Sequence, residues 1–380
     1  MRVEQRHWSA EHGWRILRAD DGCVDAQLVL LFGDSATLED ADALSVVREH
    51  YPHALLAGCS TAGEIHETSV SDDGLVTTAI RLDDGHCTLA RVRLAEFPSN
   101  HAAAQALAAQ LPIEGLVHVL VFSEGLQVNG TELTAGLDGA LPRGVTVTGG
   151  LSGDGSRFGR TVVCADDTGR GGEVVAVGLY GPRLRVGYGS LGGWDAFGPE
   201  RVITRAEGSV LYELDGRPAL DLYEEYLGEH AAGLPATGLL FPLMVRSPSA
   251  GQGGVVRTLV ATDPQARSVT FVGEMVQGHH ARLMKANFDR LIDGALGAAQ
   301  HALHGLQTPG AELALLVSCV GRRLVLRQRT EEELEAVREV VGPDTVLSGF
   351  YSYGEICPPD IKADCELHNQ TMTVTTLREI

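Results

Sequence analysis

The chain has 380 residues, of which 44% are hydrophobic, and it carries 30 Lys and Arg against 50 Asp and Glu. The resulting formal net charge of -20, with a pI near 5.1, disfavours binding to nucleic-acid backbones or to anionic membrane surfaces. Its length favours two domains, each able to bury a core. We therefore expect a soluble protein with no nucleic-acid and no membrane partner.

Targeting and redox signals favour a cytoplasmic location. No apolar signal region follows the N-terminal segment MRVEQRHWSAEHGW, and no stretch reaches the roughly 20 apolar residues needed to cross a bilayer. The seven cysteines are dispersed and contain no CxxC pair. This pattern is typical of reduced thiols and predicts neither a disulfide framework nor a structural zinc site.

Hydrophobic periodicity in the N-terminal half predicts a β-α-β-β-β-α order that occurs twice. The first copy has predicted strands at 28–32, 54–58, 75–82 and 87–94 and helices at 36–50 and 99–111. The second copy has predicted strands at 116–122, 145–150, 161–165, 173–180 and 184–191 and a helix at 131–140. We therefore expect an internally duplicated domain, built as one layered unit.

A domain boundary is predicted within 192–209, where Gly, Pro and charged residues follow neither periodicity. Beyond it we expect strands at 237–245, 255–262, 268–272 and 312–318 and helices at 219–227 and 281–303. Thr330 and Glu333 predict a capping box at the start of a further helix, which Gly342 ends.

The predicted fold class is α/β (mixed α+β), a layered sandwich of mixed sheets with helices outside and two domains. The expected parts are an N-terminal extension (1–25), a first domain (26–195), a linker (196–209) and a second domain (210–380).

The segments GCSTAGEI (58–65) and GFYSYGEI (349–356) share four of eight aligned residues, and each follows a strand-helix-strand unit. A third variant, GGLSGDG (149–155), closes the second copy. Glycine permits close backbone approach, and polar side chains at strand ends can bind a ligand. The turns therefore either line one ligand cleft or only connect packed layers. The candidate ligand-binding residues here are Gly58, Cys59, Ser60, Gly63, Glu64, Gly149, Gly150, Tyr351, Ser352, Gly354 and Glu355.

Seven segments together resemble the FIST N and FIST C domain family, in order and over nearly the whole chain. They are GCSTAGEI, GGLSGDG, GWDAFGP, LYELDGRPALDLYEEYLG, SCVGRR, GFYSYGEI and CELHNQTMTVTTL. The resemblance implies a bacterial or archaeal sensory module that binds small ligands such as amino acids. We expect a non-enzymatic protein whose ligand is an amino acid or an organic acid. The resemblance also implies partners such as histidine kinases or cyclic-di-GMP enzymes. Because some members bind haem and sense nitric oxide, a haem-based sensor that regulates a kinase is the alternative.

Four further residues are candidates for ligand contact. Cys319 and Arg322, in SCVGRR, follow a buried strand, and an arginine there can bind a ligand carboxylate or an acidic neighbour such as Glu355. His368 and Asn369 match the family pattern, and they either contact ligand or fasten the last strand.

Two less favoured activities also depend on single residue types. Cys59 would be the nucleophile of a thiol-dependent hydrolase, but the sequence identifies no histidine partner. For haem, the histidine pairs are His279 with His280 and His301 with His304, and neither predicts an axial ligand. No cofactor is assigned, haem remains an alternative, and the metal ligands are unknown.

Overall fold

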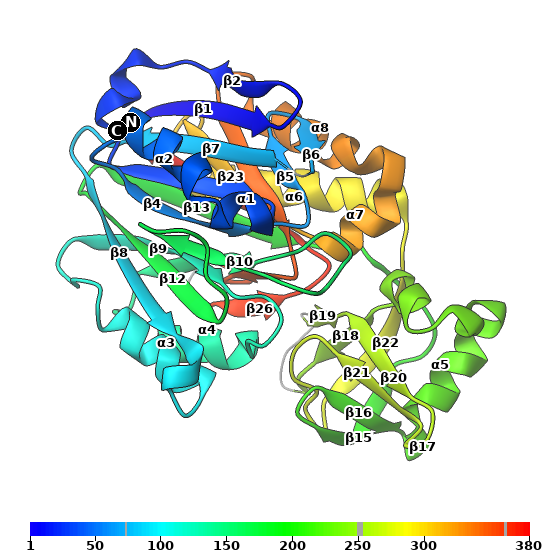
Figure 1. Cartoon of the computed structure of the whole chain (residues 1–380). Helices are drawn as coiled ribbons and strands as arrows, with labels where there is room; N and C mark the ends of the chain where they lie inside the picture. The colour runs from blue at the N-terminus through cyan, green and yellow to red at the C-terminus, as the bar shows by residue number, and fades with distance from the viewer. Residues whose placement is uncertain (73, 249–253, 361–362) are drawn as a thin grey trace.

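The structure is a computed structural model that describes residues 1–72, 74–248, 254–360 and 363–380. In these ranges, three six-stranded mixed sheets form the core, and a nine-stranded sheet forms a separate lobe, here called the satellite (Figure 1). The predicted mixed α/β fold is confirmed. None of the helices in these ranges is both long and apolar enough to cross a membrane.

The first sheet has the strand order β11-β4-β3-β7-β1-β2. Its central strand β3 is the fully buried apolar run LVLLFG, which is typical of a strand covered on both faces. The N-terminal segment also belongs to this sheet, because it forms strands β1 and β2. The elements of this unit are β1 (Arg2–Ser9), β2 (Gly13–Arg18), β3 (Leu28–Gly33), α1 (Ser35–Glu39), α2 (Ala41–His50), β4 (Leu55–Ser60), β5 (Glu64–His66), β6 (Ser69–Ser71) and β7 (Gly74–Arg81).

The second sheet repeats this arrangement with the order β26-β25-β10-β9-β12-β8. Strands β9 and β10 are parallel, as are β3 and β4, and β12 pairs antiparallel with both β9 and β8. The elements of this unit are β8 (His86–Arg93), α3 (Asn100–Ala108), β9 (Leu116–Ser123), α4 (Gly130–Ala140), β10 (Thr146–Leu151), β11 (Val163–Ala165) and β12 (Glu173–Tyr180).

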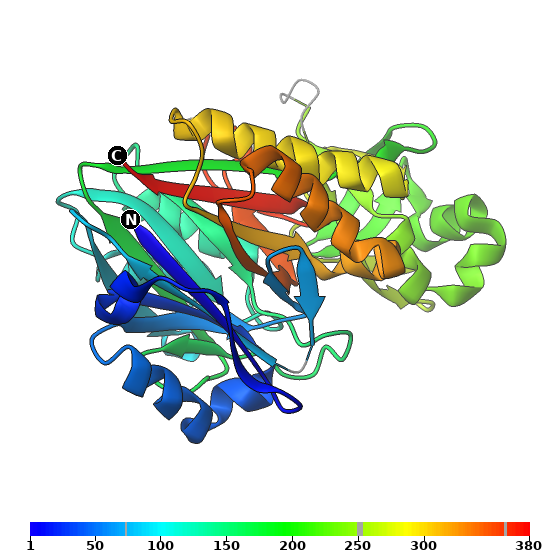
Figure 2. The same cartoon turned by 90° about the horizontal axis from the view of Figure 1, so that it is seen from above.

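The third sheet, β13-β27-β23-β24-β5-β6, has the same order again, so the predicted duplication is part of a threefold repeat. Helices α6 and α8 lie across its outer face (Figure 2). The elements of this unit are β13 (Leu184–Leu191), α6 (Phe288–Leu306), β23 (Leu313–Cys319), α7 (Val320–Leu326), α8 (Thr330–Val341), β24 (Val346–Ser352), β25 (Gly354–Cys357), β26 (Glu366–His368) and β27 (Met372–Glu379).

Each unit lends one or two strands to a neighbouring sheet, which closes the three units into a ring. Strand β5 of the first unit pairs with β24, β25 of the third pairs with β10, and β11 of the second pairs with β4. The inner faces of the sheets share one apolar core. At its centre, the rings of Phe32, Phe122 and Phe350 lie 4.9 to 6.1 Å apart, measured between centroids.

The satellite is inserted into the third unit between β13 and α6. The segment expected to be a linker contributes β14 and β15, and most of the predicted helix at 281–303 is present but starts later, after strand β22. The satellite elements are β14 (Asp195–Ala196), β15 (Arg201–Glu207), β16 (Val210–Leu214), β17 (Arg217–Pro218), α5 (Ala219–Leu227), β18 (Leu243–Arg246), β19 (Val255–Arg257), β20 (Leu259–Asp263), β21 (Ser268–Phe271) and β22 (His280–Lys285).

The predicted capping box at the start of α8 is wrong. Arg329 is the residue that precedes the helix, and no side chain caps its first turn. The Thr330 hydroxyl donates to the Arg327 carbonyl, while the Glu333 carboxylate is fully buried and accepts hydrogen bonds from Arg322. The pairing of Glu333 with a core arginine therefore replaces the local cap.

Candidate functional site

The three glycine-rich turns meet at the carboxyl ends of the parallel strands. The Gly153 amide donates to the Ser60 carbonyl at 2.9 Å, and the Ala62 amide donates to the Tyr351 carbonyl at 2.8 Å. Backbone hydrogen bonds thus join turns that are nearly 300 residues apart in the sequence. We call this the turn cluster, made of residues 58–65, 149–155 and 349–356.

The first glycine of each turn allows close packing of the parallel strands. A Cβ there would lie 1.8 or 1.9 Å from a carbonyl oxygen of the neighbouring strand. At this distance the two atoms would overlap, so only glycine fits at these positions. The glycines and the residues that provide the carbonyls are Gly58 with Leu31, Gly149 with Val121, and Gly349 with Leu316. These three glycines therefore shape the turn cluster from within the sheets.

Two of the turns carry a buried carboxyl group in equivalent positions. The Thr61 hydroxyl donates to Glu64 at 2.7 Å, and the Ser352 hydroxyl donates to Glu355 at 2.6 Å. Burial raises the pKa of Glu64 to about 8 and that of Glu355 to about 7. In the third turn the equivalent residue is Gly155, so the repeat is asymmetric at this point.

We expect the Glu64→Gln variant to become more stable relative to the wild type as pH rises. The folded-state pKa of Glu64 is raised, so its contribution to stability is present below the unfolded-state pKa near 4.5 and is lost as pH rises toward about 8. Glutamine stays neutral and avoids this loss. Urea denaturation at about pH 5 and about pH 8.5 should show the difference growing by on the order of 3 kcal/mol.

The matched control is Glu331→Gln, because Glu331 is an exposed carboxylate beside the same turn. Because this side chain is exposed, the stability difference between Glu331→Gln and the wild type should change less between the two pH values than the difference for Glu64→Gln. Equal free-energy differences for Glu64→Gln at both pH values would contradict a carboxyl group that is protonated in the folded state.

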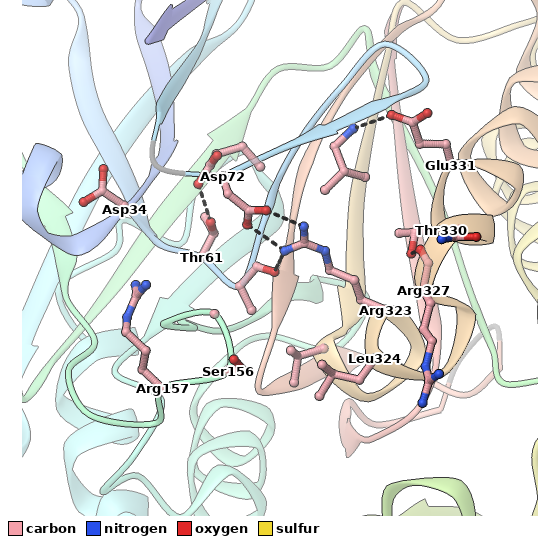
Figure 3. A pocket seen from close by; sticks show the side chains of 16 residues that line it. Asp34, Thr61, Asp72, Ser156, Arg157, Arg323, Leu324, Arg327, Thr330 and Glu331 are labelled. Atoms are coloured by element: carbon pink, nitrogen blue, oxygen red, sulfur yellow. Dashed lines mark hydrogen bonds and ion pairs between the residues drawn. The ribbon is translucent and has the colours of Figure 1, made fainter. Parts of the chain in front are cut away.

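A polar pocket of about 810 Å³ opens between the turn cluster and α7 (Figure 3). We call it the turn pocket. Its walls come from the first unit, from the segment after β10, and from helices α7 and α8. The lining residues are Asp34, Thr61, Ala62, Glu64, Val70, Asp72, Gly155, Ser156, Arg157, Val320, Arg323, Leu324, Arg327, Gln328, Thr330 and Glu331.

Arg323 joins α7 to the first unit across one side of the turn pocket. Its guanidinium group forms two hydrogen bonds with the Asp72 carboxylate, at 2.7 and 2.6 Å, and donates to the Ala62 carbonyl at 2.6 Å. It also lies 5.6 Å from the centroid of the Tyr351 ring. Gly63 leaves room for this contact, since a Cβ there would lie 2.6 Å from Arg323 Nη1.

Positively and negatively charged side chains line the rest of the turn pocket. Arg327, at the end of α7, is exposed, and Arg157 is paired with Asp154. Asp34 accepts hydrogen bonds from the first amides of α1, and Glu331 accepts one from the Val70 amide at 3.2 Å. Such a pocket can bind a small polar molecule that carries a carboxylate and an ammonium group.

Cys59 and Ser60 point into the protein and away from the turn pocket. The Cys59 thiol is fully buried, and this burial raises its pKa well above the usual value, which is unfavourable for a nucleophile. The Ser60 hydroxyl donates to the Gly153 carbonyl at 2.8 Å and accepts from the Val162 amide at 3.0 Å. The geometry of both residues fits a structural role.

Arg322 forms a buried ion pair. Its Nη2 lies 2.8 Å from Glu333 Oε2, with both side chains fully buried, so its acidic partner is Glu333 instead of the suggested Glu355. Further donors reach the carbonyls of Gly192 and Leu291. Tyr351 donates to the same Glu333 carboxylate at 2.6 Å. Arg322 and Tyr351 therefore stabilise the third unit.

The remaining predicted residues lie on the side of the turn cluster that faces the satellite. His368, in β26, contacts the Cys357 carbonyl at 2.9 Å through Nε2, and burial lowers its pKa to about 4. Asn369 donates to the His368 carbonyl at 2.9 Å. A Cβ on Gly150 would lie 2.9 Å from the carbonyl oxygen of Gly354. These contacts fasten β25 and β26 to the second sheet.

The two histidine pairs considered for haem lie in different parts of the fold, one in the satellite and one on α6. His280, in the satellite, contacts Glu200 at 2.6 Å through Nδ1. His301 and His304, on α6, line a pocket of about 230 Å³. The described ranges contain no group of three or more His, Cys, Asp or Glu side chains arranged to hold a metal ion. The structure assigns no axial ligand.

Sequence reasoning found Glu64 in the turn pocket but missed most of its charged residues. The segment SCVGRR was not predicted to be helical, yet α7 starts at Val320. Successive helical residues point about 100° apart, so Arg322 faces the core and Arg323 faces the turn pocket. A helix prediction there would have separated the two arginines.

Comparison with known proteins identifies a family over most of the chain. A family model described as FIST N domain matches residues 27–217, and one described as FIST C domain matches residues 219–358. Uncharacterized proteins of Mycobacterium tuberculosis (strains CDC 1551 and H37Rv) are each 29% identical over 231 residues, which is 57% of this chain and 57% of theirs. An uncharacterized Mycobacterium bovis protein is 29% identical over 233 residues, 57% of this chain and 56% of its own.

Among solved structures, cyanuric acid hydrolase from A. caulinodans aligns with 12% identity and a TM-score of 0.19, over 78% of this chain and 99% of that one. This likeness is too low to support an argument. The matched segment spans a little more than half the length of the curated relatives. The two family matches, in contrast, are consecutive and cover most of the sequence. The chain therefore belongs to the FIST family of signal-transduction sensory domains, with a FIST N domain followed by a FIST C domain.

Proposed function

We propose that the turn pocket binds a small amino acid or organic acid and that the chain acts as a sensor and not as an enzyme. The observation that carries this proposal is the presence of arginine and carboxylate side chains around one polar pocket where three strand ends meet (Figure 3). Strand ends of this kind are common ligand sites in α/β proteins.

The expected binding mode uses the charges of the turn pocket. Arg327 supplies a guanidinium group for the ligand carboxylate, because no ion pair within the described ranges occupies it. An ammonium group on the ligand would face Asp34 or Glu331. The Thr61 hydroxyl and the neutral Glu64 carboxyl add hydrogen-bonding groups.

Helix α7 offers a route from the turn pocket to a partner. Its residue Arg323 and the adjoining Arg327 line the pocket, while Val325 and Leu326 share an apolar cluster with Leu240 of the satellite. A ligand that prefers one position of α7 would therefore bias the orientation of the satellite. The proposed reader is a separate signalling enzyme, such as a histidine kinase or a cyclic-di-GMP enzyme.

The substitution Arg327→Gln should weaken ligand binding by about tenfold or more, since it removes a charge-assisted hydrogen bond. A thermal-shift screen of the 20 amino acids and the dicarboxylic acids from malonate to adipate would first identify a stabilising compound. The matched control is Arg329→Gln. Arg329 pairs with Glu332 and Asp289 and does not line the turn pocket, so its loss should leave affinity unchanged.

Equal weakening by both substitutions would indicate a general effect of charge and would contradict the proposed site. An absorption spectrum of protein purified from haem-supplemented cells distinguishes the proposed small-molecule sensor from the alternative, a haem-based sensor. A stoichiometric Soret band, with no stabilising compound in the screen, would favour the haem-based nitric-oxide sensor.

A further inference from the structure

A second cavity, of about 750 Å³, lies between the core and the satellite. We call it the interlobe cavity. The core wall comes from the segments 125–130 and 319–321, and the satellite wall comes from 271–274 and the neighbouring strands. Its size is that of a pocket for a drug-sized molecule. A ligand here would touch both lobes at once.

The interlobe cavity exposes large apolar side chains to solvent. Leu126, Phe158 and Val260 are 39%, 47% and 43% exposed, and all three line it. The Phe158 ring also stacks on Tyr353, with centroids 4.5 Å apart and planes inclined by 18°. Exposed apolar groups gathered in one concave site are typical of a binding surface. The ring pair favours a flat ligand that can extend the stack.

One polar group of the satellite wall is buried without a partner. Thr258 is 5% exposed and lines the interlobe cavity, and its hydroxyl Oγ1 has no hydrogen-bond partner in the described ranges. An unpaired buried hydroxyl is unfavourable, and a hydrogen bond to a ligand would remove this penalty. The neighbouring Arg257 donates to the Leu367 carbonyl at 2.8 Å and so joins the satellite to the core.

The charges around the interlobe cavity disfavour an anion. Among the residues that the structure describes, its lining includes Glu132 and Glu274 but no lysine or arginine. Glu274 is exposed at the rim, and Arg257 lies behind the wall, against Gly273. This differs from the turn pocket, which three arginines line. The two cavities therefore suit ligands of different chemistry.

We propose that the interlobe cavity binds an uncharged, flat heteroaromatic molecule, whose ring packs against Phe158 and whose edge forms a hydrogen bond with the Thr258 hydroxyl. Binding would hold the satellite against the core, because the two contact groups belong to different lobes. This second site does not depend on the ligand proposed for the turn pocket.

The test uses the full chain and lumichrome, an uncharged tricyclic ring compound whose own fluorescence reports binding through anisotropy. Adenine and caffeine, measured by calorimetry, serve as smaller ring probes. We expect saturable binding of at least one probe. The substitution Val260→Trp, which fills the cavity from an exposed strand position, should weaken binding by at least about tenfold.

The control Val276→Trp changes another exposed valine of the satellite, one that does not line the interlobe cavity, and should leave binding unchanged. Thr258→Val removes only the unpaired hydroxyl, so it should weaken binding several-fold without lowering the melting temperature. The absence of saturable binding by all three probes at millimolar concentration would overturn the proposal. Equal affinity of the wild type and Val260→Trp would also overturn it.

Discussion

Replacement of Gly349 by alanine is expected to lower the free energy of unfolding by more than about 3 kcal/mol or to prevent folding. The new Cβ would lie 1.8 Å from the Leu316 carbonyl oxygen and 2.7 Å from its carbonyl carbon. Both atoms belong to the backbone of the parallel neighbour strand β23, so no side-chain rotation can relieve the clash. Urea denaturation followed by circular dichroism measures the loss.

Two further substitutions test whether this effect belongs to the threefold repeat. Gly58→Ala should have a loss similar to that of Gly349→Ala, because its Cβ would lie 1.8 Å from the equivalent carbonyl oxygen. A Cβ on Gly139, in α4, would have no atom of another element within 4 Å, so alanine there should stabilise by up to about 1 kcal/mol. A Gly349→Ala protein as stable as Gly139→Ala would contradict the described strand packing.

Replacement of Arg322 by leucine is expected to destabilise the protein by about 3–5 kcal/mol, because Glu333 would be left as a buried charge without its cation. The carbonyls of Gly192 and Leu291 would also lose a donor. Arg322 lines neither large cavity, so its substitution tests stability and not ligand affinity. Chemical denaturation near neutral pH is the appropriate measurement.

A double-mutant cycle measures the interaction energy between Arg322 and Glu333 separately from their other contacts. Glu333→Leu alone should be strongly destabilising, whereas the double variant Arg322→Leu with Glu333→Leu should lose less than the sum of the two. Arg329→Gln removes a partly exposed ion pair with Glu332 and should cost at most about 1 kcal/mol. Additive losses in the cycle would show that the two buried side chains do not interact.

The strands of the core could be predicted from the sequence because they are short apolar runs. The predicted strands at 28–32, 116–122 and 312–318 correspond to β3, β9 and β23, the first parallel strand of each unit. Burial on both faces removes the need for polar residues, so the pattern is clear without any tertiary information. The twofold repeat of the N-terminal half was readable for the same reason.

The third unit was harder to predict, because about 95 residues of the satellite separate β13 from α6. The exchange of β5, β11 and β25 between sheets is also invisible to periodicity, which reports one strand at a time. Periodicity places most of strand β22 in a helix, because its residues continue into the amphipathic pattern of α6.

The site was only partly predictable. The repeat of Glu64 and Glu355 marked the turn cluster, since the two segments that contain these residues share four of eight aligned positions. The charged walls of the turn pocket come instead from separate units, as Asp72 and Arg323 do. Nothing in their local sequence relates two residues that are 251 positions apart, so their contact depends on the fold.

The central claim is that the turn pocket binds a small amino acid or organic acid, and isothermal titration calorimetry tests it most directly. The titrant is the strongest stabiliser from the amino-acid and dicarboxylic-acid screen, added to the wild type and to Arg327→Gln. We predict one bound ligand per chain and a dissociation constant at least about tenfold higher in the variant. No binding heat from any compound of the panel, or the same affinity in both proteins, would contradict the claim.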